Sequence, residues 1–313
     1  MTTRGETRPR LRPEPGPRRR LRVRRLAAAG PLAWLGPSLV LVVGVVVYPL
    51  YEVVRTSFQT VGITGQILGP AGWANYRLLL HTPDLSTVIV NTVIWVTVGV
   101  AVTTVIALAL AHLLSMEFPL RRVVRAALIV PWASSIVMTA IGFRWMLNYY
   151  YGALNPILED LHVIHGPVDW LGDTSTVRWV LIGVVVFISL PFTTMALLSG
   201  LHAIPHDVIE AAHVDGAGWL GTYRRVVLPL LRGPLIITVL LNSVWIFNSF
   251  PIIYVLNMSN PGYGNDTTMT LMYKLSFVTN HNVGEGAALS VLNVAVAGIG
   301  VALVLRKTRL GAA

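Results

Sequence analysis

The chain has 313 residues, of which 54% are hydrophobic and only 12% are charged, and it contains no cysteine. A soluble domain usually has about 25% charged residues, so this composition excludes an ordinary soluble protein and indicates one embedded in lipid. The lack of cysteine also excludes disulfides and thiolate sites.

Residues 1–30 carry much of the formal net charge of +10. Ten arginines lie between Arg4 and Arg25, among prolines and glycines, in a segment too polar to bury a core. We expect a disordered cytosolic tail that faces membrane lipid and binds no nucleic acid. The apolar run after Arg25 is too long for a signal peptide, so we interpret it as a retained first span, with a twin-arginine export signal as the alternative.

Six stretches are apolar and long enough for a helix to cross a bilayer, which takes about 20 residues. They cover approximately residues 31–54, 88–114, 126–147, 179–200, 235–258 and 286–305. Residues 31–313 are therefore predicted to form an all-α integral membrane domain with six transmembrane helices. Pro49, Pro131, Pro191 and Pro251 lie inside four of these stretches. Each is expected to kink its helix, either as bundle geometry or as a gating hinge.

The basic residues are distributed unevenly between the two sides of the predicted bundle. If the N-terminus is cytosolic, the inner segments hold 19 of the 24 Lys and Arg residues, and the outer segments and span edges hold the rest. Cytosolic segments of membrane proteins carry such an excess. Both the N- and the C-terminus are therefore predicted to be cytosolic.

The predicted cytosolic loop at residues 201–234 interrupts the apolar pattern. Asp207 and Glu210 place negative charge near the start of a short helix, where the helix dipole favours it. Asp215-Gly216 is a turn signal, with Gly216 able to take a positive φ, and a second short helix is expected after it. From the residues alone, this loop is either a docking surface for another protein or an interfacial amphipathic segment.

The spacing of Glu210-Ala211-Ala212, Gly216 and Leu228-Pro229 resembles the EAA motif of bacterial binding-protein-dependent ABC importers. The wider stretches "AIPHDVIEAAHVDGAG", "GWANYRLLL" and "IVPWASSIV" resemble the carbohydrate-type permeases of that family, which include maltose and glycerol-3-phosphate transporters. The resemblance implies a type I importer permease bundle whose loop seats in a groove of an ATP-hydrolysing subunit. The coupling residues would be Asp207, Glu210, Ala211, Ala212, Asp215, Gly216, Leu228 and Pro229.

The same resemblance implies the partners and the location. The partners would be a second homologous permease subunit, two ATP-binding subunits and an extracytoplasmic solute-binding protein, assembled in the bacterial cytoplasmic membrane. The sequence has no recognisable phosphate-binding loop, metal-ligand spacing or Ser/His/Asp set. We therefore expect no catalytic residue, cofactor or metal in this chain, with ATP and Mg²⁺ bound by the partner subunits.

The fifth apolar stretch contains the candidate solute path. Asn242, Trp245, Asn248 and Ser249 fall close to one helical face. Trp245 could stack on a sugar ring while the amides hydrogen-bond its hydroxyl groups. The alternative is that these polar side chains only hold helices together. Weaker candidates of the same kind are Asn293, Thr193 and Thr194.

These observations predict the permease subunit of an ABC importer for a carbohydrate. Phe250-Pro251 and "NMSNPGYGNDTT" depart from the pattern of many sugar permeases and leave the solute open. A polyol or a glycerol phosphate ester is the alternative solute. A membrane-embedded enzyme and a structural scaffold are alternatives from other classes, but the first lacks convergent acids, bases or metal ligands. The second would not require a docking loop for a motor.

Overall fold

The computed structural model describes residues 34–257, 263–279 and 281–310. The chain divides into two compact units, Met1–Arg55 and Thr56–Ala313. The predicted tail at residues 1–30 lies outside the described residues. The predicted first span corresponds to a helix over Trp34–Ser57 that contains a π-helical turn, η1 (Val43–Val47), followed by α2 (Tyr48–Ser57). Pro49 is the second residue of α2, separated from η1 by one residue, and this wider turn accommodates the missing donor of the proline.

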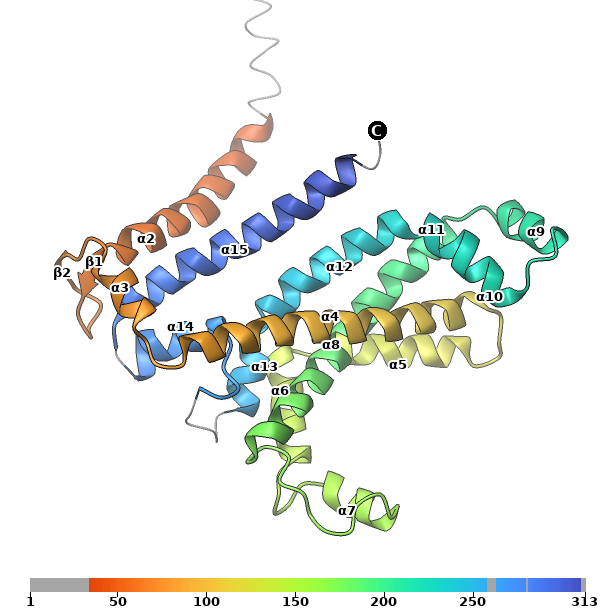
Figure 1. Cartoon of the computed structure of the whole chain (residues 1–313), viewed down its shortest axis with the longest axis horizontal. Helices are drawn as coiled ribbons and strands as arrows, with labels where there is room; N and C mark the ends of the chain where they lie inside the picture. Colours follow the sequence, from red (N-terminus) through yellow and green to blue (C-terminus); the bar gives the residue numbers. More distant parts are fainter. Residues whose placement is uncertain (1–33, 258–262, 280, 311–313) are drawn as a thin grey trace, which may run out of the picture. The chain divides into compact units, whose positions relative to one another are not determined.

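The second unit is built from helices (Figure 1). The long ones are α4 (Leu85–Ser115), α5 (Arg121–Ala133), α6 (Ile136–Met146), α8 (Thr174–His202), α12 (Arg232–Phe247) and α15 (Val283–Leu310). The short ones are α3 (Ala74–Leu80), α7 (Leu154–Asp160), α9 (His206–Val214), α10 (Trp219–Thr222), α11 (Leu228–Leu230), α13 (Phe250–Leu256) and α14 (Thr268–Tyr273), with π-helical turns η2 (Tyr223–Val227) and η3 (Lys274–Val278). Strands β1 (Gln59–Val61) and β2 (Ile67–Pro70) form an antiparallel hairpin that the sequence analysis did not predict.

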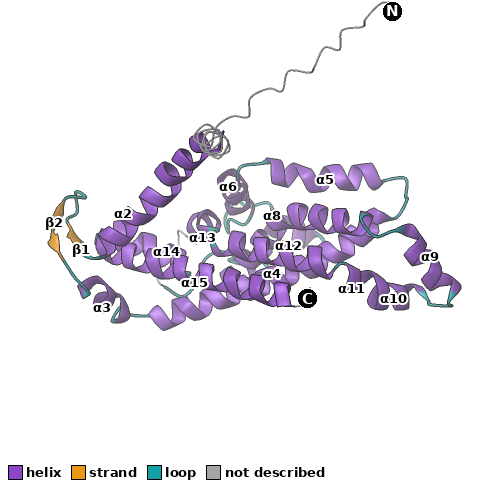
Figure 2. Cartoon of the chain, turned by 90° about the horizontal axis from the view of Figure 1, so that it is seen from above, coloured by secondary structure: helices purple, strands orange, loops and turns teal. Residues whose placement is uncertain are grey.

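The core of the second unit lies where α4, α8 and α12 pack together (Figure 2). Trp95 of α4, Val185 of α8 and Ile246 of α12 are all buried there. Gly99 lets the three helices approach, since a Cβ atom on it would lie 3.4 Å from Ile246 and 3.5 Å from Val185. Apolar packing of this density fixes the relative positions of helices. The predicted second and fourth spans, α4 and α8, thus form the centre of the unit.

Four helices among the described residues are long and apolar enough to cross a membrane, and six spans result if each of two bent helix pairs counts as one. This range of four to six spans includes the predicted six-span bundle. The helix α8 runs through Pro191 without a break. The third and fifth predicted spans differ from the single kinked helices that the sequence analysis expected.

The third predicted span consists of two helices, α5 and α6, bent by 101° at a short break. Pro131 lies in the last turn of α5 and has no N–H to donate to the preceding turn. Ser134 and Ser135 then take extended backbone conformations, with ψ of 151° and 135°. The side chain of Ser134 also donates to the carbonyl of Val130 at 3.3 Å, which competes with the backbone pattern. The prediction of one kinked helix is wrong at this position.

The fifth predicted span is also two helices, α12 and α13, which are separated at Asn248 and Ser249. The side chain of Asn248 donates to the carbonyl of Val244 at 2.8 Å, and that of Ser249 donates to the carbonyl of Ile246 at 2.5 Å. Both carbonyls belong to the last turn of α12 and also accept the backbone N–H groups of Asn248 and Ser249, so the side chains add a second donor to each carbonyl where the helix ends. Pro251 lies in the first turn of α13, where a missing N–H costs little. It therefore starts a helix and does not kink one.

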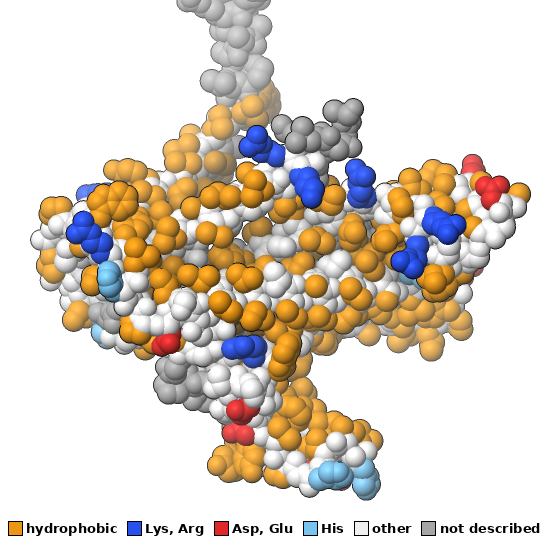
Figure 3. All heavy atoms as spheres, in the orientation of Figure 1, with side chains coloured by type: hydrophobic (Ala, Val, Ile, Leu, Met, Phe, Trp, Pro, Cys, Tyr) orange, Lys and Arg blue, Asp and Glu red, His pale blue; other side chains and the backbone are white. Residues whose placement is uncertain are grey.

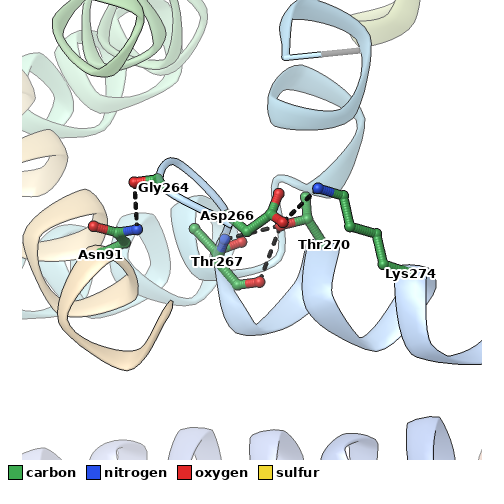
Figure 4. A network of polar contacts seen from close by, with 6 residues as sticks. All are labelled: Asn91, Gly264, Asp266, Thr267, Thr270 and Lys274. Atoms are coloured by element: carbon green, nitrogen blue, oxygen red, sulfur yellow. Dashed lines mark hydrogen bonds and ion pairs between the residues drawn. The ribbon is translucent and has the colours of Figure 1, made fainter. Parts of the chain in front are cut away.

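A polar network holds the segment before α14 against the core (Figure 4). The carbonyl of Gly264 accepts from Asn91 Nδ2 at 2.8 Å and from Arg178 at 3.1 Å. Two residues later, Asp266 pairs with Lys274 of η3, with 2.6 Å between Oδ2 and Nζ. Burial raises the pKa of the Asp266 carboxyl, although the ammonium of Lys274 opposes this effect. The network therefore ties α4, α8 and η3 to a single short segment.

Exposed hydrophobic side chains cover most of the face of the unit that Figure 3 shows, whereas charged side chains occur in small groups. Many large residues on this unit are exposed, among them Val105 at 67%, Trp145 at 68% and Val296 at 63%. Soluble monomers rarely expose continuous apolar surface of this extent. The surface is that of a protein in contact with lipid or with other membrane subunits.

Candidate functional site

The segment between α8 and α12 forms the helix, turn and second helix that the sequence predicted. The helix α9 begins at His206, with Pro205 as its N-cap and Asp207 in its first turn. Glu210 lies one turn further on, and its carboxylate is 3.2 Å from Nδ1 of His206. Acidic residues at this end of a helix are stabilised by the helix dipole. The acidic side chains thus support α9 and remain on its surface.

Gly216 ends α9 in the left-handed conformation, with a φ of 81°. The N–H of Gly216 donates to the carbonyl of His213 at 3.0 Å, and the N–H of Ala217 donates to that of Ala212 at 3.0 Å. This pair of hydrogen bonds is the Schellman motif, which satisfies the last carbonyls of a helix and sets the direction in which the chain leaves it. Asp215 is the C-cap residue. The positive φ predicted for Gly216 is confirmed.

The second half of the loop continues as α10, η2 and α11, which lead into α12. Pro229 lies in the first turn of α11, beside Leu228. Pro234 lies in the first turn of α12. Pro234 removes no hydrogen bond of α12, whereas Pro229 lacks an N–H in a run whose preceding residues Val227 and Leu228 are already helical. The chain therefore stays helical from the loop into the fifth span, with a bend of 69° between Trp219–Leu230 and α12.

The predicted coupling residues lie mostly on the surface of the loop. Asp207, Glu210, Ala211, Asp215, Gly216 and Pro229 are exposed, whereas Ala212 and Leu228 are half-buried. Large apolar side chains stand beside them, with Val214 exposed at 88%, Trp219 at 61% and Leu220 at 54%. Exposed aromatic and large apolar side chains grouped on one short helical segment are features of a protein-docking surface.

One contact of this loop was not predicted. The indole Nε1 of Trp219 donates to Nε2 of His112 at 3.0 Å, and the His112 ring also packs on Tyr223, with 4.9 Å between ring centroids. His112 lies near the C-terminal end of α4, 107 residues away in sequence. These rings border a cavity of about 340 Å³ between α4, α8 and the loop. The sequence carries no local signal for this pairing, because it depends on how α4 packs against α8.

The candidate solute residues lie beside a second cavity, of about 550 Å³, between α5, α8, α12 and α15. Its polar and aromatic lining residues are Trp132, Ser189, Phe192, Asn242, Trp245 and Asn248. The other lining residues are aliphatic. Two indoles, one phenyl ring and two amides thus share one cavity that carries no charged side chain.

Asn242 contributes the most unusual side chain of this cavity. It is 2% exposed, and its Nδ2 has no hydrogen-bond partner among the described residues. A buried amide donor without a partner is costly unless water or a ligand satisfies it. Asn242, Trp245 and Asn248, three of the four predicted path residues, line this cavity together.

The fourth predicted path residue, Ser249, does not line the cavity. It is buried, and its Oγ accepts from Nε1 of Trp95 at 3.2 Å. Thr193 and Thr194 are buried and also lie away from the cavity, whereas Ser189 and Phe192 of the same helix line it. Asn293 contacts the sulfur of Met269 at 3.7 Å. None of these four residues lines the cavity, and their role in the solute path stays a prediction.

Trp132 is a lining residue that the sequence analysis did not select. It follows Pro131 directly in the third predicted span and is 59% exposed. The broken geometry of α5 and α6 brings it beside α8 and α12 at the cavity. The sequence signal that could have selected Trp132 is its position next to a proline in the middle of an apolar stretch.

Residues 99–308 match the family model described as the binding-protein-dependent transport system inner membrane component. The chain is 34% identical over 260 residues to a probable ABC transporter permease protein of Brucella suis, covering 83% of this chain and 90% of that protein. It is also 34% identical over 221 residues to the trehalose/maltose transport system permease protein of Thermococcus litoralis, covering 71% of this chain and 74% of that protein.

Two solved structures share the fold. One is a bacterial ABC transporter involved in the import of the acidic polysaccharide alginate, with a TM-score of 0.80 at 19% identity, covering 93% of this chain and 98% of the other. The second is the alginate transporter in complex with an alginate pentasaccharide-bound periplasmic protein, with a TM-score of 0.78 at 18% identity, covering 93% and 96%. At these identities the likeness shows the fold of an ABC importer permease.

Proposed function

The chain belongs to the family of binding-protein-dependent transport system inner membrane components, and we propose that it moves a neutral carbohydrate through the membrane on behalf of ATP-hydrolysing partners. The observation that carries this proposal is the cavity lined by Trp132, Asn242 and Trp245. Indole faces pack on the C–H faces of sugar rings, and amides exchange hydrogen bonds with hydroxyl groups. Asn242 and Asn248 place two amide side chains among the lining residues for this purpose.

The charge of the cavity supports a neutral solute. A phosphate ester or an acidic sugar is bound in proteins by Arg, Lys or helix N-termini. No Arg or Lys is among the residues that line this cavity. A glycerol phosphate ester, the alternative from the sequence, is therefore less well matched than a neutral sugar or a polyol. The trehalose/maltose permease of Thermococcus litoralis, by its name, serves neutral disaccharides.

The loop between α8 and α12 has the features expected of a contact site for an ATP-binding partner subunit. Its coupling residues form an exposed helical corner held by the Schellman motif at Gly216. We propose that this corner seats in a groove of an ATP-binding subunit, one of two in the assembly, and that ATP and Mg²⁺ bind there. ATP-driven closure of the two motors would then shift the loop and rock the bundle between two openings.

The remaining partners follow from the same proposal. A second, homologous permease would complete the path, and a solute-binding protein would deliver the sugar from outside. The alginate transporter was solved in complex with an alginate pentasaccharide-bound periplasmic protein. The protein is an integral membrane protein by its family and its apolar helices. We place it in the bacterial cytoplasmic membrane, with both termini inside.

Uptake by intact cells tests the proposal. A strain that lacks the gene should lose uptake of one labelled neutral sugar from a panel of trehalose, maltose, diacetylchitobiose and glycerol, with glycerol 3-phosphate as the charged comparison. The wild-type gene should restore uptake, whereas Glu210→Lys in the coupling loop should not. Loss of glycerol 3-phosphate uptake alone would contradict the neutral-solute assignment. Unchanged uptake of the whole panel would contradict a role in carbohydrate import.

A further inference from the structure

The helix α4 contacts both functional regions, although neither is near it in sequence. Close to its C-terminal end, Nε2 of His112 accepts the hydrogen bond from Trp219 in the coupling loop, at 3.0 Å. Nearer its other end, Nε1 of Trp95 donates to the carbonyl of Ile246 at 2.9 Å and to Oγ of Ser249 at 3.2 Å. Ile246 and Ser249 flank the break between α12 and α13. One helix thus holds the loop at one end and the break at the other.

Between these two contacts α4 is a continuous helix. Seventeen residue steps separate Trp95 from His112, which corresponds to about 26 Å at a rise of 1.5 Å per residue. Ala107 and Ala111 are fully buried against α8, so the helix is closely supported along this length. The third and fifth spans are both broken. A continuous, supported helix moves as one body, whereas broken helices can pivot where they are interrupted.

The break that Trp95 holds lies beside the solute cavity. Trp245 and Asn248 line that cavity, and Asn248 is itself the first residue of the break. The hydroxyl of Ser249 receives the Trp95 indole and donates to Ile246, so a single buried cluster fixes the angle at which α12 ends. Movement of Trp95 along the axis of α4 would change this angle and with it the position of Asn248.

We propose that α4 is the mechanical link between the coupling loop and the solute cavity, with His112 and Trp95 as positioning residues at its two ends. This inference rests on the proposed function, since it assumes that a motor moves the loop. Displacement of Trp219 pulls on His112, α4 moves with it, and Trp95 shifts the break at Asn248 and Ser249. A hydrogen bond has a preferred distance and angle, so movement of one partner should move the other in the same direction.

A competing route exists through the backbone. The helix α8 runs into the loop through Ala203 and Ile204, and α11 leads from the loop directly into α12. If these covalent connections carried all of the movement, the bond between His112 and Trp219 would be a packing contact only. The two routes differ in whether the acceptor atom of His112 matters.

Variants of His112 separate the acceptor from the ring. His112→Phe keeps an aromatic ring against Tyr223 but removes the acceptor. His112→Gln removes the ring but places an amide oxygen within reach of the position of Nε2. Trp219→Phe removes the donor at the other side of the bond, and Trp95→Phe removes the donor at the break. The control is Trp179→Phe, because Trp179 is 63% exposed near the start of α8, at the end remote from the loop.

The readout is a single cysteine in a chain that has none. Leu241 lines the solute cavity and is 51% exposed, so Leu241→Cys reports on the accessibility of the cavity. The assembled transporter, reconstituted in vesicles, is treated with a membrane-impermeant maleimide with and without ATP and Mg²⁺. Labelling of this chain is measured together with ATP hydrolysis and subunit stoichiometry.

In the Leu241→Cys reference, ATP should change the labelling rate. His112→Phe, Trp219→Phe and Trp95→Phe should each reduce this ATP effect about fivefold, the lower end of typical coupling strengths. In His112→Phe and Trp95→Phe, ATP hydrolysis and stoichiometry should stay at the reference level. Because Trp219 lies on the docking surface of the loop, the ATP effect in Trp219→Phe is compared at equal stoichiometry and per ATP hydrolysed. His112→Gln and Trp179→Phe should preserve the ATP effect. If His112→Phe does not assemble, Trp219→Phe gives the same test from the exposed loop.

An unchanged ATP effect in Trp219→Phe and Trp95→Phe would overturn the link and assign the movement to the backbone route. A loss in His112→Gln as large as in His112→Phe would also overturn it, because only the shape of the ring would then matter. The absence of any ATP effect in the reference would be a failure of the proposed function itself. The two failures are therefore distinguishable.

Discussion

The ammonium of Lys274 lies 2.6 Å from Oδ2 of Asp266, in a pair whose carboxyl side chain is 2% exposed and whose lysine side chain is 18% exposed. Burying both charges of such a pair costs desolvation free energy, and the attraction between the two charges recovers only part of that cost. The raised pKa of Asp266 reflects this balance, because burial outweighs the lysine. The pair therefore contributes little net stability. Its main effect is to fix the position of the segment that contains Gly264.

The pH dependence of stability follows from this shift. A carboxyl whose pKa is raised in the folded state binds its proton more tightly there than in the unfolded chain, where the value is 3.8. Its contribution to stability is fully present below that unfolded value and is lost as pH rises through the folded pKa. Lys274→Met removes an interaction that lowers the pKa of Asp266. The folded-state pKa should therefore rise further, and stability should continue to fall up to a higher pH. The destabilisation by this variant should be small near pH 4 and grow to roughly 3 kcal/mol near neutrality.

Thermal unfolding in detergent across this pH range measures the effect. The double variant Asp266→Asn with Lys274→Met leaves no charge unpaired and should recover much of the lost stability at neutral pH. A deficit of Lys274→Met that is independent of pH would contradict the assignment to Asp266.

Trp245 provides the prediction for the solute cavity. If it stacks on the solute, Trp245→Ala should cost on the order of 1–3 kcal/mol, by analogy with base stacking on aromatic residues, while assembly with the ATP-binding subunits is retained. The uptake assay should show a loss of roughly 5- to 150-fold in affinity or rate. Trp179→Ala, a tryptophan away from the cavity, is the control. Normal uptake by Trp245→Ala would favour a packing role for this residue.

The orientation of the chain remains a prediction from its basic residues. A reporter fused after Arg309 should behave as cytosolic, and one inserted at residues 258–262 should behave as external. The second site is chosen because the neighbouring Gly264 carbonyl accepts hydrogen bonds from Asn91 and Arg178, so an insertion at Gly264 itself would disturb the fold. Exchange of the two readouts would contradict the inside location of both termini.

The sequence predicted the parts of this structure that depend on local chemistry. The turn at Gly216 is such a case, because Asp-Gly after a short helix leaves few alternatives. The placement of Ser249 shows the limit of the same reasoning. Its spacing from Trp245 puts both on one face only if the helix continues, and the helix ends at Phe247. Helical periodicity cannot be extended through a break whose position depends on tertiary contacts.

The contacts of α4 were not predictable for a related reason. Trp95 meets Ser249 across 154 residues, and His112 meets Trp219 across 107. Both contacts arise because α4 packs between α8 and α12, and a single sequence specifies that each helix is apolar without specifying which neighbours it meets. The apolar lengths predicted the bundle, whereas its breaks at Ser134 and Asn248 needed the side-chain hydrogen bonds of the structure.

The last prediction concerns Gly216 and has a matched control in the same loop. With a φ of 81°, Gly216 lies in a region that a β-branched residue rarely adopts, although no atom would block its Cβ. Gly216→Val should therefore cost about 1–3 kcal/mol of backbone strain, and its relief would change the direction in which the chain leaves α9. Gly218 is two residues further on with a φ of −66° and ψ of 163°, an extended conformation that valine favours, and its Cβ would also meet open space.

Gly216→Val should reach the membrane, because the apolar spans insert independently of the loop, but Ala211 and Ala212 would no longer be presented to the motor. Uptake should be lost, and ATP hydrolysis stimulated by the binding protein should be lost or disconnected from transport. Gly218→Val should keep both activities near the wild-type level. The measurement is the subunit stoichiometry, stimulated ATPase rate and vesicle uptake of the purified complexes. Wild-type values for Gly216→Val in all three, or equal losses in Gly218→Val, would show that the turn at Gly216 has no special role in coupling.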